Sequence, residues 1–187
     1  FDDDGALQYG FTEFHGDTYY SDPQTGVLVA GGTYVISKVA YLADSVGRLV
    51  KLQFGQDLAN ASALQKKIAA YAWAEPTTPL GWCAMWVHNV FENIGWNDIY
   101  GNACDLYNYY CTSSDPSQLQ VGMIVAVSRH PLTSGGRIYG HIGIYVGNGV
   151  MLDSSGTVRT WYAGDWADTY SGWVPAKWGW YGGRSLA

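Results

Sequence analysis

The chain has 187 residues, of which 48% are hydrophobic and 14% are charged, and its formal net charge is −6 at pH 7. This length and composition are typical of a globular protein of one or two domains. A pI of about 4.9 argues against the basic surface that nucleic-acid binding needs. The sequence contains no apolar run of about 18 residues, the length that would indicate a membrane-spanning helix.

The N-terminal part of the chain contains a short repeat. Gly-x-Leu triplets at 5–7, 26–28 and 47–49 recur every 21 residues, and each follows an aspartate by three or four positions. Aromatic segments separated by Asp/Gly turns at such a short period predict a stacked array of β-hairpins. Residues 1–5 resemble the end of a repeat, so we expect more repeats upstream, preceded by a secretion signal.

The repeats have the pattern of a wall-binding module. The run Tyr-Tyr-Ser-Asp at 19–22, followed by Gly-Val-Leu at 26–28, resembles the choline-binding or glucan-binding type of cell-wall repeat. The Gly-Trp pairs of that family are missing, and Gly10-Phe11 is the nearest equivalent. The resemblance implies that residues 1–52 bind choline on wall teichoic acid or a glycan. The alternative is a spacer that only holds the next domain away from the wall.

Two helices are expected next. Residues 57–74 are rich in helix formers and have helical periodicity. The apolar residues that would share one face are Leu58, Leu64, Ile68 and Tyr71. Residues 75–79 contain two prolines that break this helix. A second helix is expected to begin between Thr78 and Gly81 and to end at Gly95. Its apolar stripe comprises Cys83, Val87, Val90, Phe91 and Ile94.

Cys83 lies in the first turn of the second predicted helix. A helix N-terminus carries partial positive charge and free N–H groups, which stabilise a thiolate, the nucleophilic form of cysteine. A small cysteine on an apolar stripe is equally explained by packing alone. Cys104 and Cys111 are close enough in sequence to form a disulfide across a short loop, which would leave Cys83 as the odd thiol.

Residues 140–153, GHIGIYVGNGVMLD, predict a β-hairpin around a Gly-Asn-Gly turn. A turn centred near Gly147 would place His141 directly opposite Asp153. Residues opposed in this way have Cβ atoms about 4.5 to 5.5 Å apart, which allows an imidazole–carboxylate hydrogen bond. Without a nucleophile nearby, this pair would be a surface ion pair at the mouth of a hairpin.

The order of cysteine on a helix, histidine on a strand and a polar residue on the next strand is that of a papain-like triad. Residues 65–183 resemble the cell-wall cysteine amidohydrolase superfamily, which includes the NlpC-type endopeptidases and the CHAP amidases. The motifs that carry the resemblance are GWCAMWV at 81–87, VGMI at 121–124 and YGHIGIY at 139–145. The resemblance implies an α+β, papain-like fold with a small antiparallel sheet and a catalytic N-terminal helix.

The family's third triad member lies about twelve residues after the histidine, and Asp153 has that spacing, although His, Asn or Gln is more usual there. An aspartate can orient the imidazole and stabilise its charged form. The implied reaction is acyl transfer, with Cys83 as nucleophile, His141 as general acid and base, and the main-chain N–H of Cys83 as an oxyanion donor.

Two further residues are candidates for contacts with substrate. NlpC-type sequences often have a Tyr-x-Trp motif before the cysteine whose tyrosine lines the site, and Tyr71 is its counterpart, unless it is a core aromatic on its helix. Trp82 replaces the aspartate that usually precedes the cysteine. Together with Ala84 it removes polar groups that recognise a free amine in some members, which favours intact stem peptides or a different bond.

The other histidines compete poorly for the role of base. His88 follows Cys83 by five residues, roughly 140° around a helix, so it should point away. His130 lies in a segment that is either a loop over the site or a solvated excursion, and His15 lies in the repeats. No Cys/His cluster has metal-ligand spacing, so we expect neither a metal nor a cofactor.

The sequence therefore predicts wall-binding repeats at 1–52 and a cysteine hydrolase domain at 53–187. The expected protein is secreted and associated with the cell wall, with peptidoglycan as its partner and without nucleic-acid binding or a membrane span. The first functional hypothesis is an endopeptidase acting within the stem peptide. An amidase cleaving between muramic acid and L-alanine is the second, and a non-catalytic wall-binding module is the third.

Overall fold

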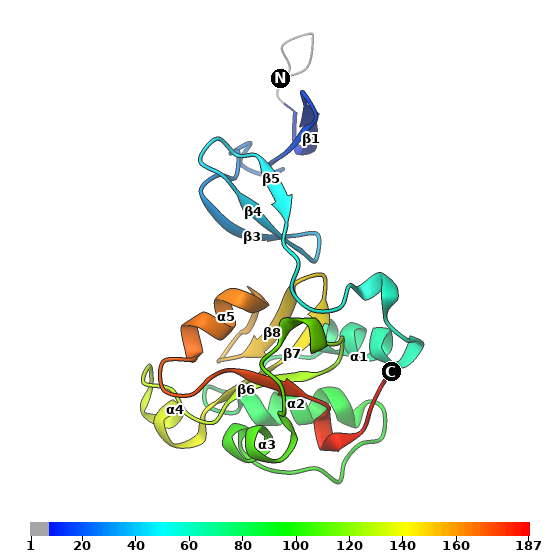
Figure 1. Cartoon of the computed structure of the whole chain (residues 1–187), viewed down its shortest axis with the longest axis vertical. Helices are drawn as coiled ribbons and strands as arrows, with labels where there is room; N and C mark the ends of the chain where they lie inside the picture. Colours follow the sequence, from blue (N-terminus) through cyan, green and yellow to red (C-terminus); the bar gives the residue numbers. More distant parts are fainter. Residues whose placement is uncertain (1–7) are drawn as a thin grey trace. The chain divides into compact units, whose positions relative to one another are not determined.

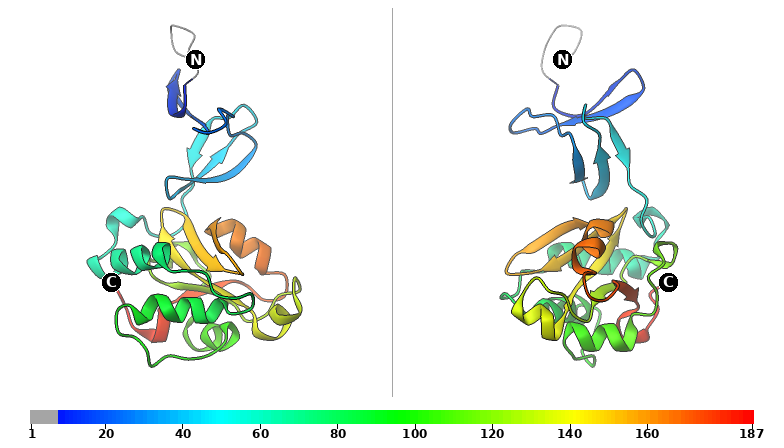
Figure 2. Two further views of the ribbon diagram at one scale, coloured as in Figure 1. Left: turned by 180° about the vertical axis from the view of Figure 1, so that it is seen from behind. Right: turned by 60° about the vertical axis from the view of Figure 1, so that its left-hand side comes forward.

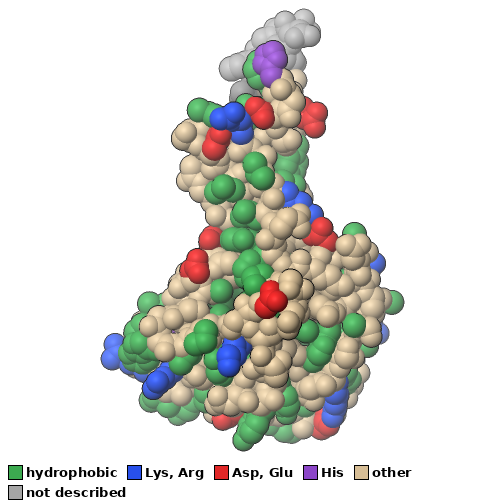
Figure 3. Space-filling model, in the orientation of Figure 1, with side chains coloured by type: hydrophobic (Ala, Val, Ile, Leu, Met, Phe, Trp, Pro, Cys, Tyr) green, Lys and Arg blue, Asp and Glu red, His purple; other side chains and the backbone are tan. Residues whose placement is uncertain are grey.

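The computed structural model describes residues 8–187, and the chain divides into two compact units, Phe1–Gln53 and Phe54–Ala187 (Figure 1). Charged side chains are scattered over the face shown in Figure 3 and do not gather there into a basic patch. None of the helices in the described residues is long and apolar enough to cross a membrane.

The first unit consists of antiparallel strands. β1 (Gly10–Phe14) pairs with β2 (Asp17–Ser21). A second sheet has the order β3 (Gly32–Ile36), β4 (Val39–Ala43) and β5 (Leu49–Lys51). Its core consists of Ile36, Ala43 and Leu49, against which Tyr20, Val29, Tyr34 and Tyr41 pack.

Aspartates hold the two turns of this unit in which the repeated Gly-x-Leu triplets lie. Asp22 accepts hydrogen bonds from the backbone N–H groups of residues 24 and 25 at 2.9 and 2.8 Å. Asp44 accepts them from the backbone N–H groups of residues 46 and 48, both at 2.9 Å. The glycines at 26 and 47 have positive φ and donate to the backbone oxygens of the same aspartates. This geometry explains why aspartate and glycine keep a short spacing here. The triplet at 5–7 lies outside the described residues.

The second unit is an α+β domain, and this coarse fold class is confirmed. Its antiparallel sheet has the order β10-β6-β7-β8-β9. The strands are β6 (Ile124–Val127), β7 (His141–Gly147), β8 (Val150–Ser154), β9 (Val158–Tyr162) and β10 (Lys177–Gly179). All residues of β7 and β8 are buried, so side chains on these two strands have well-defined positions.

The described residues of this unit contain five α-helices and three short 3₁₀ segments. The helices are α1 (Ala63–Ala74), α2 (Cys83–Glu92), α3 (Ala103–Tyr110), α4 (Ser134–Tyr139) and α5 (Ala163–Tyr170). The 3₁₀ segments are Leu58–Asn60, Pro116–Gln118 and Tyr181–Gly183. α1 and α2 pack against β7 and lie on one face of the sheet (Figure 2), whereas α3 packs against β6 and β10. Trp86 and Phe91 of α2 and Ile142 and Ile144 of β7 are fully buried.

The first predicted helix begins later than expected. The helix starts at Ala63 because Ser62 and Gln65 form a capping box, in which each side chain accepts a hydrogen bond from the other's backbone N–H. The preceding residues contain only a 3₁₀ turn. Of the predicted apolar face only Ile68 is buried; the other buried residues of the helix are Gln65, Ala69 and Ala72.

The second predicted helix also begins later, at Cys83 and not between Thr78 and Gly81. Gly81 has a φ of 89°, which a right-handed helix does not allow. The Thr78 side chain donates instead to the backbone oxygen of Trp82 at 3.0 Å, which fixes a loop before the helix. The helix ends at Glu92, three residues before the predicted end, and Gly95 (φ 82°) lies in the turn that follows it.

The disulfide considered from the sequence is not formed, because all three cysteines are free. Cys104 and Cys111 are not joined by a short loop: Cys104 lies in the first turn of α3 and Cys111 directly follows its last residue. At about 1.5 Å of rise per residue, their Cα atoms lie roughly 10 Å apart, beyond the reach of a disulfide.

Candidate active site

Cys83 is the first residue of α2, with 8% of its surface exposed. No side chain caps the start of this helix. The backbone N–H groups of the first turn are therefore free to interact with negative charge, as helix N-termini generally are. The Cys83 thiol forms a hydrogen bond with the side chain of His141.

His141 is the first residue of β7, and a single residue, Gly140, separates it from the end of α4. Gly140 has a φ of 73°, and a Cβ atom there would lie only 2.0 Å from the backbone oxygen of Val127. Only glycine fits this close approach of β6 and β7. The strand pairing then places His141 opposite Val127, with 7% of its surface exposed.

The register predicted for the β7–β8 hairpin is wrong by two residues. Asp153 lies opposite Gly143, not opposite His141, because the turn lies at Asn148 and Gly149. The ladder also shifts between Tyr145 and Gly147, which leaves one extra residue in β7.

This bulge keeps Asp153 on the face of the sheet that carries His141. Side chains alternate between the two faces of a strand, so a shift of one position would reverse them. Without the bulge, Asp153 would lie opposite Ile144 and point away from His141. With it, the two side chains are diagonal neighbours across Gly143, which has no side chain to separate them. His141 Nε2 and Asp153 Oδ2 lie 2.8 Å apart, which leaves Nδ1 for the Cys83 thiol.

Two residues that sequence reasoning missed hold Asp153 in place. Arg159 lies directly opposite Asp153 on β9. It donates from Nε to Oδ1 at 2.8 Å and from Nη2 to Oδ2 at 2.6 Å. Trp166 of α5 donates from Nε1 to Oδ2 at 2.8 Å. The Ser-Ser-Gly-Thr run at 154–157 could have indicated a second hairpin, in which 153 pairs with 159.

Three aromatic rings surround the imidazole of His141. Trp166 stacks on it with ring centroids 5.8 Å apart, and Tyr170 lies 4.8 Å away. The third ring is His130, at 6.1 Å. The Nδ1 atom of His130 accepts the backbone N–H of Leu132 at 3.3 Å, which places the ring proton of neutral His130 on Nε2. Burial, and then the proximity of His141, lower the pKa of His130, so this ring stays neutral.

The ionisable side chains of the site shift one another's pKa values. Burial lowers the pKa of His141, but the hydrogen bonds with Asp153 and Cys83 outweigh burial and raise the pKa to about 9. Burial opposes the charge of Asp153, yet His141 and Arg159 together hold the pKa of this carboxyl below its usual range. An imidazolium and a carboxylate are thus the favoured forms of this pair near neutral pH.

A cleft of about 460 Å³ opens onto Cys83 and His141. Its floor and walls come from the loop before α2, the start of α3, the segment from His130 to Gly140, and β9. Arg159 and Tyr170 also line it. His130 therefore lies in a wall of the cleft. Of the two alternatives that the sequence allowed for its segment, a loop over the site and a solvated excursion, this agrees with the first.

The other candidate residues lie outside this cleft. Tyr71 is half-buried on α1, with the Lys67 ammonium 5.7 Å from its ring centroid, and does not line the cleft. Trp82 precedes Cys83 but does not line the cleft, and it is 55% exposed. His88 contacts the hydroxyl of Tyr181 through Nδ1 at 3.3 Å. In the described residues no group of three or more His, Cys, Asp or Glu side chains could hold a metal ion.

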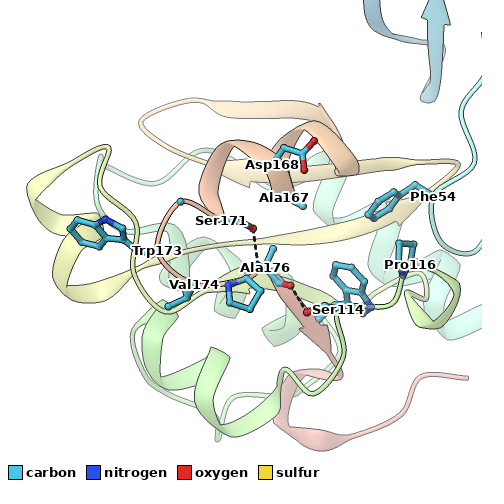
Figure 4. Close-up of a pocket in the computed structure, with 12 residues that line it drawn as sticks. Phe54, Ser114, Pro116, Ala167, Asp168, Ser171, Trp173, Val174 and Ala176 are labelled. Carbon is cyan, nitrogen blue, oxygen red and sulfur yellow. Dashed lines mark hydrogen bonds between the residues drawn. The ribbon is translucent and has the colours of Figure 1, made fainter.

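A second hollow, of about 560 Å³, lies between α5 and β10 (Figure 4). Phe54 and Trp173 are at opposite ends of it, and Asp168 is the acidic residue in its lining. Its lining contains neither cysteine nor histidine. The hollow therefore offers surface for contact but no nucleophile and base, and the candidate active site is the cleft at Cys83.

Comparison of the chain with protein-family models and with curated proteins gave no match.

Proposed function

We propose that the protein is a cysteine hydrolase that cleaves an amide bond in peptidoglycan stem peptides. The observation that carries the proposal is a buried histidine with the Cys83 thiol on one side and the Asp153 carboxylate, 2.8 Å away, on the other. Nucleophile, base and orienting group in this order form the arrangement used in covalent acyl transfer. A papain-like relationship is part of this proposal.

The residues suggest the following steps. The Cys83 thiolate attacks the amide carbonyl carbon, and its negative charge passes to the carbonyl oxygen. The backbone N–H of Cys83, at the start of α2, is positioned to donate to that oxygen. His141 then protonates the leaving amine as the C–N bond breaks and the thioester remains. Neutral His141 next takes a proton from water, whose oxygen attacks the thioester; the acid is released and Cys83 returns to the thiolate beside the imidazolium.

Peptidoglycan as the substrate rests on the sequence motifs around Cys83 and His141 and on the wall-type repeats. An endopeptidase within the stem peptide is the first reaction we propose, and an amidase between muramic acid and L-alanine is the second. A secreted, wall-associated protein belongs to the same proposal. A non-catalytic wall-binding module is less well supported, because Cys83 and His141 line a solvent-accessible cleft and Asp153 contacts His141 from the buried side.

Mass spectrometry of digested muropeptides tests this function. A new terminus on a diamino acid would indicate an endopeptidase, and a new amine on the L-alanine of the stem would indicate an amidase. The Cys83→Ala variant is the matched control and should release neither product. Intact muropeptides after incubation with a folded, thiol-reactive wild-type protein would contradict the proposal.

We expect activity to fall on the alkaline side with an apparent pKa near 9, where His141 loses its proton. The imidazolium must protonate the leaving amine, so kcat/KM should drop about tenfold per pH unit above that value. Measuring kcat/KM between pH 5 and pH 10.5 on a soluble muropeptide checks this. Asp153→Asn should move the alkaline limb to lower pH, because the hydrogen bond with Asp153 helps to raise the pKa of His141. If the alkaline limb lay at the same pH in the wild type and in Asp153→Asn, the assignment of this pKa to His141 would be wrong.

Removal of residues 1–52 should leave hydrolysis of soluble muropeptides nearly unchanged. The reason is that the cleft and its supporting residues all belong to the unit Phe54–Ala187. Wall binding, measured by co-sedimentation with purified cell walls, should fall in the same truncation. A large loss of kcat/KM in a truncated protein with a native circular dichroism spectrum would show that the repeats contribute to the site.

A further inference from the structure

The lining of the cleft contains basic side chains but no carboxylate. It includes His130, His141 and Arg159 but no aspartate or glutamate. The whole chain, in contrast, has 16 acidic and 10 basic residues other than histidine. Asp153 contacts His141 and Arg159 from the interior of the domain. Because it is completely buried, its carboxylate is not exposed to a ligand in the cleft.

The guanidinium of Arg159 has unused hydrogen-bond donors. Of its five N–H groups, the one on Nε donates to Asp153 Oδ1. The two on Nη2 donate to Asp153 Oδ2 and, at 2.8 Å, to the hydroxyl of Tyr170. The Nη2 atom also lies 3.1 Å from His141 Nε2, but that nitrogen already donates to Asp153. The two N–H groups of Nη1 remain, and 31% of the side chain is exposed.

We propose that Arg159 Nη1 forms a subsite for a carboxylate of the substrate. This inference rests on the proposed function, since it takes Cys83 as the attacking group. Arg159 lies across His141 from Cys83, so the carboxylate would be separated from the reacting carbonyl by a short spacer. Hydrogen bonds between guanidinium and carboxylate are charge-assisted, and the lining contains no Asp or Glu side chain that could take the place of the substrate carboxylate.

The subsite narrows the substrate class. The preferred stem peptides carry a free carboxylate near the scissile amide, and peptides in which this group is amidated are poorer substrates. The pair of free acid and carboxamide differs in charge but hardly in shape. It therefore isolates the contribution of Arg159 from that of cleft size.

Alkylation of Cys83 tests the subsite without any peptidoglycan. The probes are bromoacetyl-glycine, which ends in a carboxylate, and bromoacetyl-glycinamide, its neutral counterpart. We expect the wild type to react about tenfold faster with the acid than with the amide, relative to the same ratio for a free peptide thiol, as one charge-assisted contact would give. The second-order rate constant is measured by mass spectrometry of the Cys83 peptide.

Variants separate recognition from support of the triad. Arg159→Gln should abolish the preference for the acid, and Arg159→Lys should retain part of it. Asp153→Asn should react more slowly with both probes but keep the preference, because Arg159 is still present. Arg137→Gln is the matched control, since Arg137 is a cation on the neighbouring α4 that does not line the cleft, and its ratio should equal that of the wild type.

The outcomes distinguish this inference from the proposed function. A wild-type ratio equal to that of a free thiol overturns the carboxylate subsite even if muropeptides are cleaved. A preference that survives in Arg159→Gln overturns the assignment to Arg159. A preference that depends on Arg159, in a protein that cleaves no muropeptide, supports the subsite and overturns the peptidoglycan proposal.

Discussion

Cys83→Ala and His141→Ala should each reduce turnover to the background rate, a loss on the order of 10⁶-fold if chemistry limits the wild type. Alanine removes the nucleophile in the first variant and the proton carrier in the second. No substitute is near: the other two cysteines lie on α3 and at its end. His130 keeps its Nδ1 on the backbone N–H of Leu132.

The rate of Cys83 alkylation checks the same pair by a second route. Iodoacetamide should label the wild type rapidly below pH 7 and label His141→Ala slowly, because the imidazolium stabilises the thiolate. Cys104→Ser is the matched control: it removes a half-buried thiol outside the cleft and should change neither turnover nor the labelling rate of Cys83. Full turnover in Cys83→Ala, or labelling no faster than that of a free peptide thiol, would show that the assignment is wrong.

The sequence predicted the three central residues because each lies in a short local pattern. Cys83 lies at the start of an amphipathic stripe, and His141 and Asp153 flank a Gly-Asn-Gly turn. Whether the two flanking residues face each other, however, depends on a single bulge in β7. A bulge of this kind leaves only a weak signal in the sequence, because Val146 fits the apolar alternation as well as its neighbours do.

The residues that hold the triad were harder to predict. Arg159 contacts Asp153 through the pairing of β8 with β9, and Trp166 reaches it from α5. Such contacts join elements whose relative placement is a tertiary property. The starts of α1 and α2 were missed for a different reason. They are set by side-chain capping at Ser62 and by the positive φ of Gly81, and the periodicity of apolar residues does not show either feature.

Asp153→Ala should destabilise the fold and also reduce activity strongly. The carboxylate accepts hydrogen bonds from His141, Arg159 and Trp166, and alanine would leave these donors unpaired in a buried site. Removing one partner of a buried ion pair usually lowers the free energy of unfolding by about 3 to 5 kcal/mol. We expect a loss of about 3 kcal/mol, the lower end of this range, because Arg159 is partly exposed. Urea denaturation followed by circular dichroism measures this loss.

Asp153→Asn is the more informative change, because sequence and structure predict different results for it. From the sequence alone, an amide that still accepts from His141 should be tolerated, because Asn is more usual than Asp at this place in the superfamily that the sequence resembles. In the structure both carboxylate oxygens accept from Arg159, and Oδ2 also accepts from His141 and Trp166. An asparagine must turn its NH₂ group toward one of these donors, so either the arginine or the histidine contact is lost.

We therefore expect Asp153→Asn to be closer to Asp153→Ala than to the wild type, with kcat reduced about 10³- to 10⁴-fold, as when a triad carboxylate is neutralised. The exposed Asp168→Asn on α5 is the matched control, since it makes the same chemical change away from the cleft. If Asp153→Asn kept the urea midpoint and kcat of the wild type, Arg159 would not depend on the carboxylate. The triad would then be one in which any hydrogen-bond acceptor at 153 suffices to orient His141.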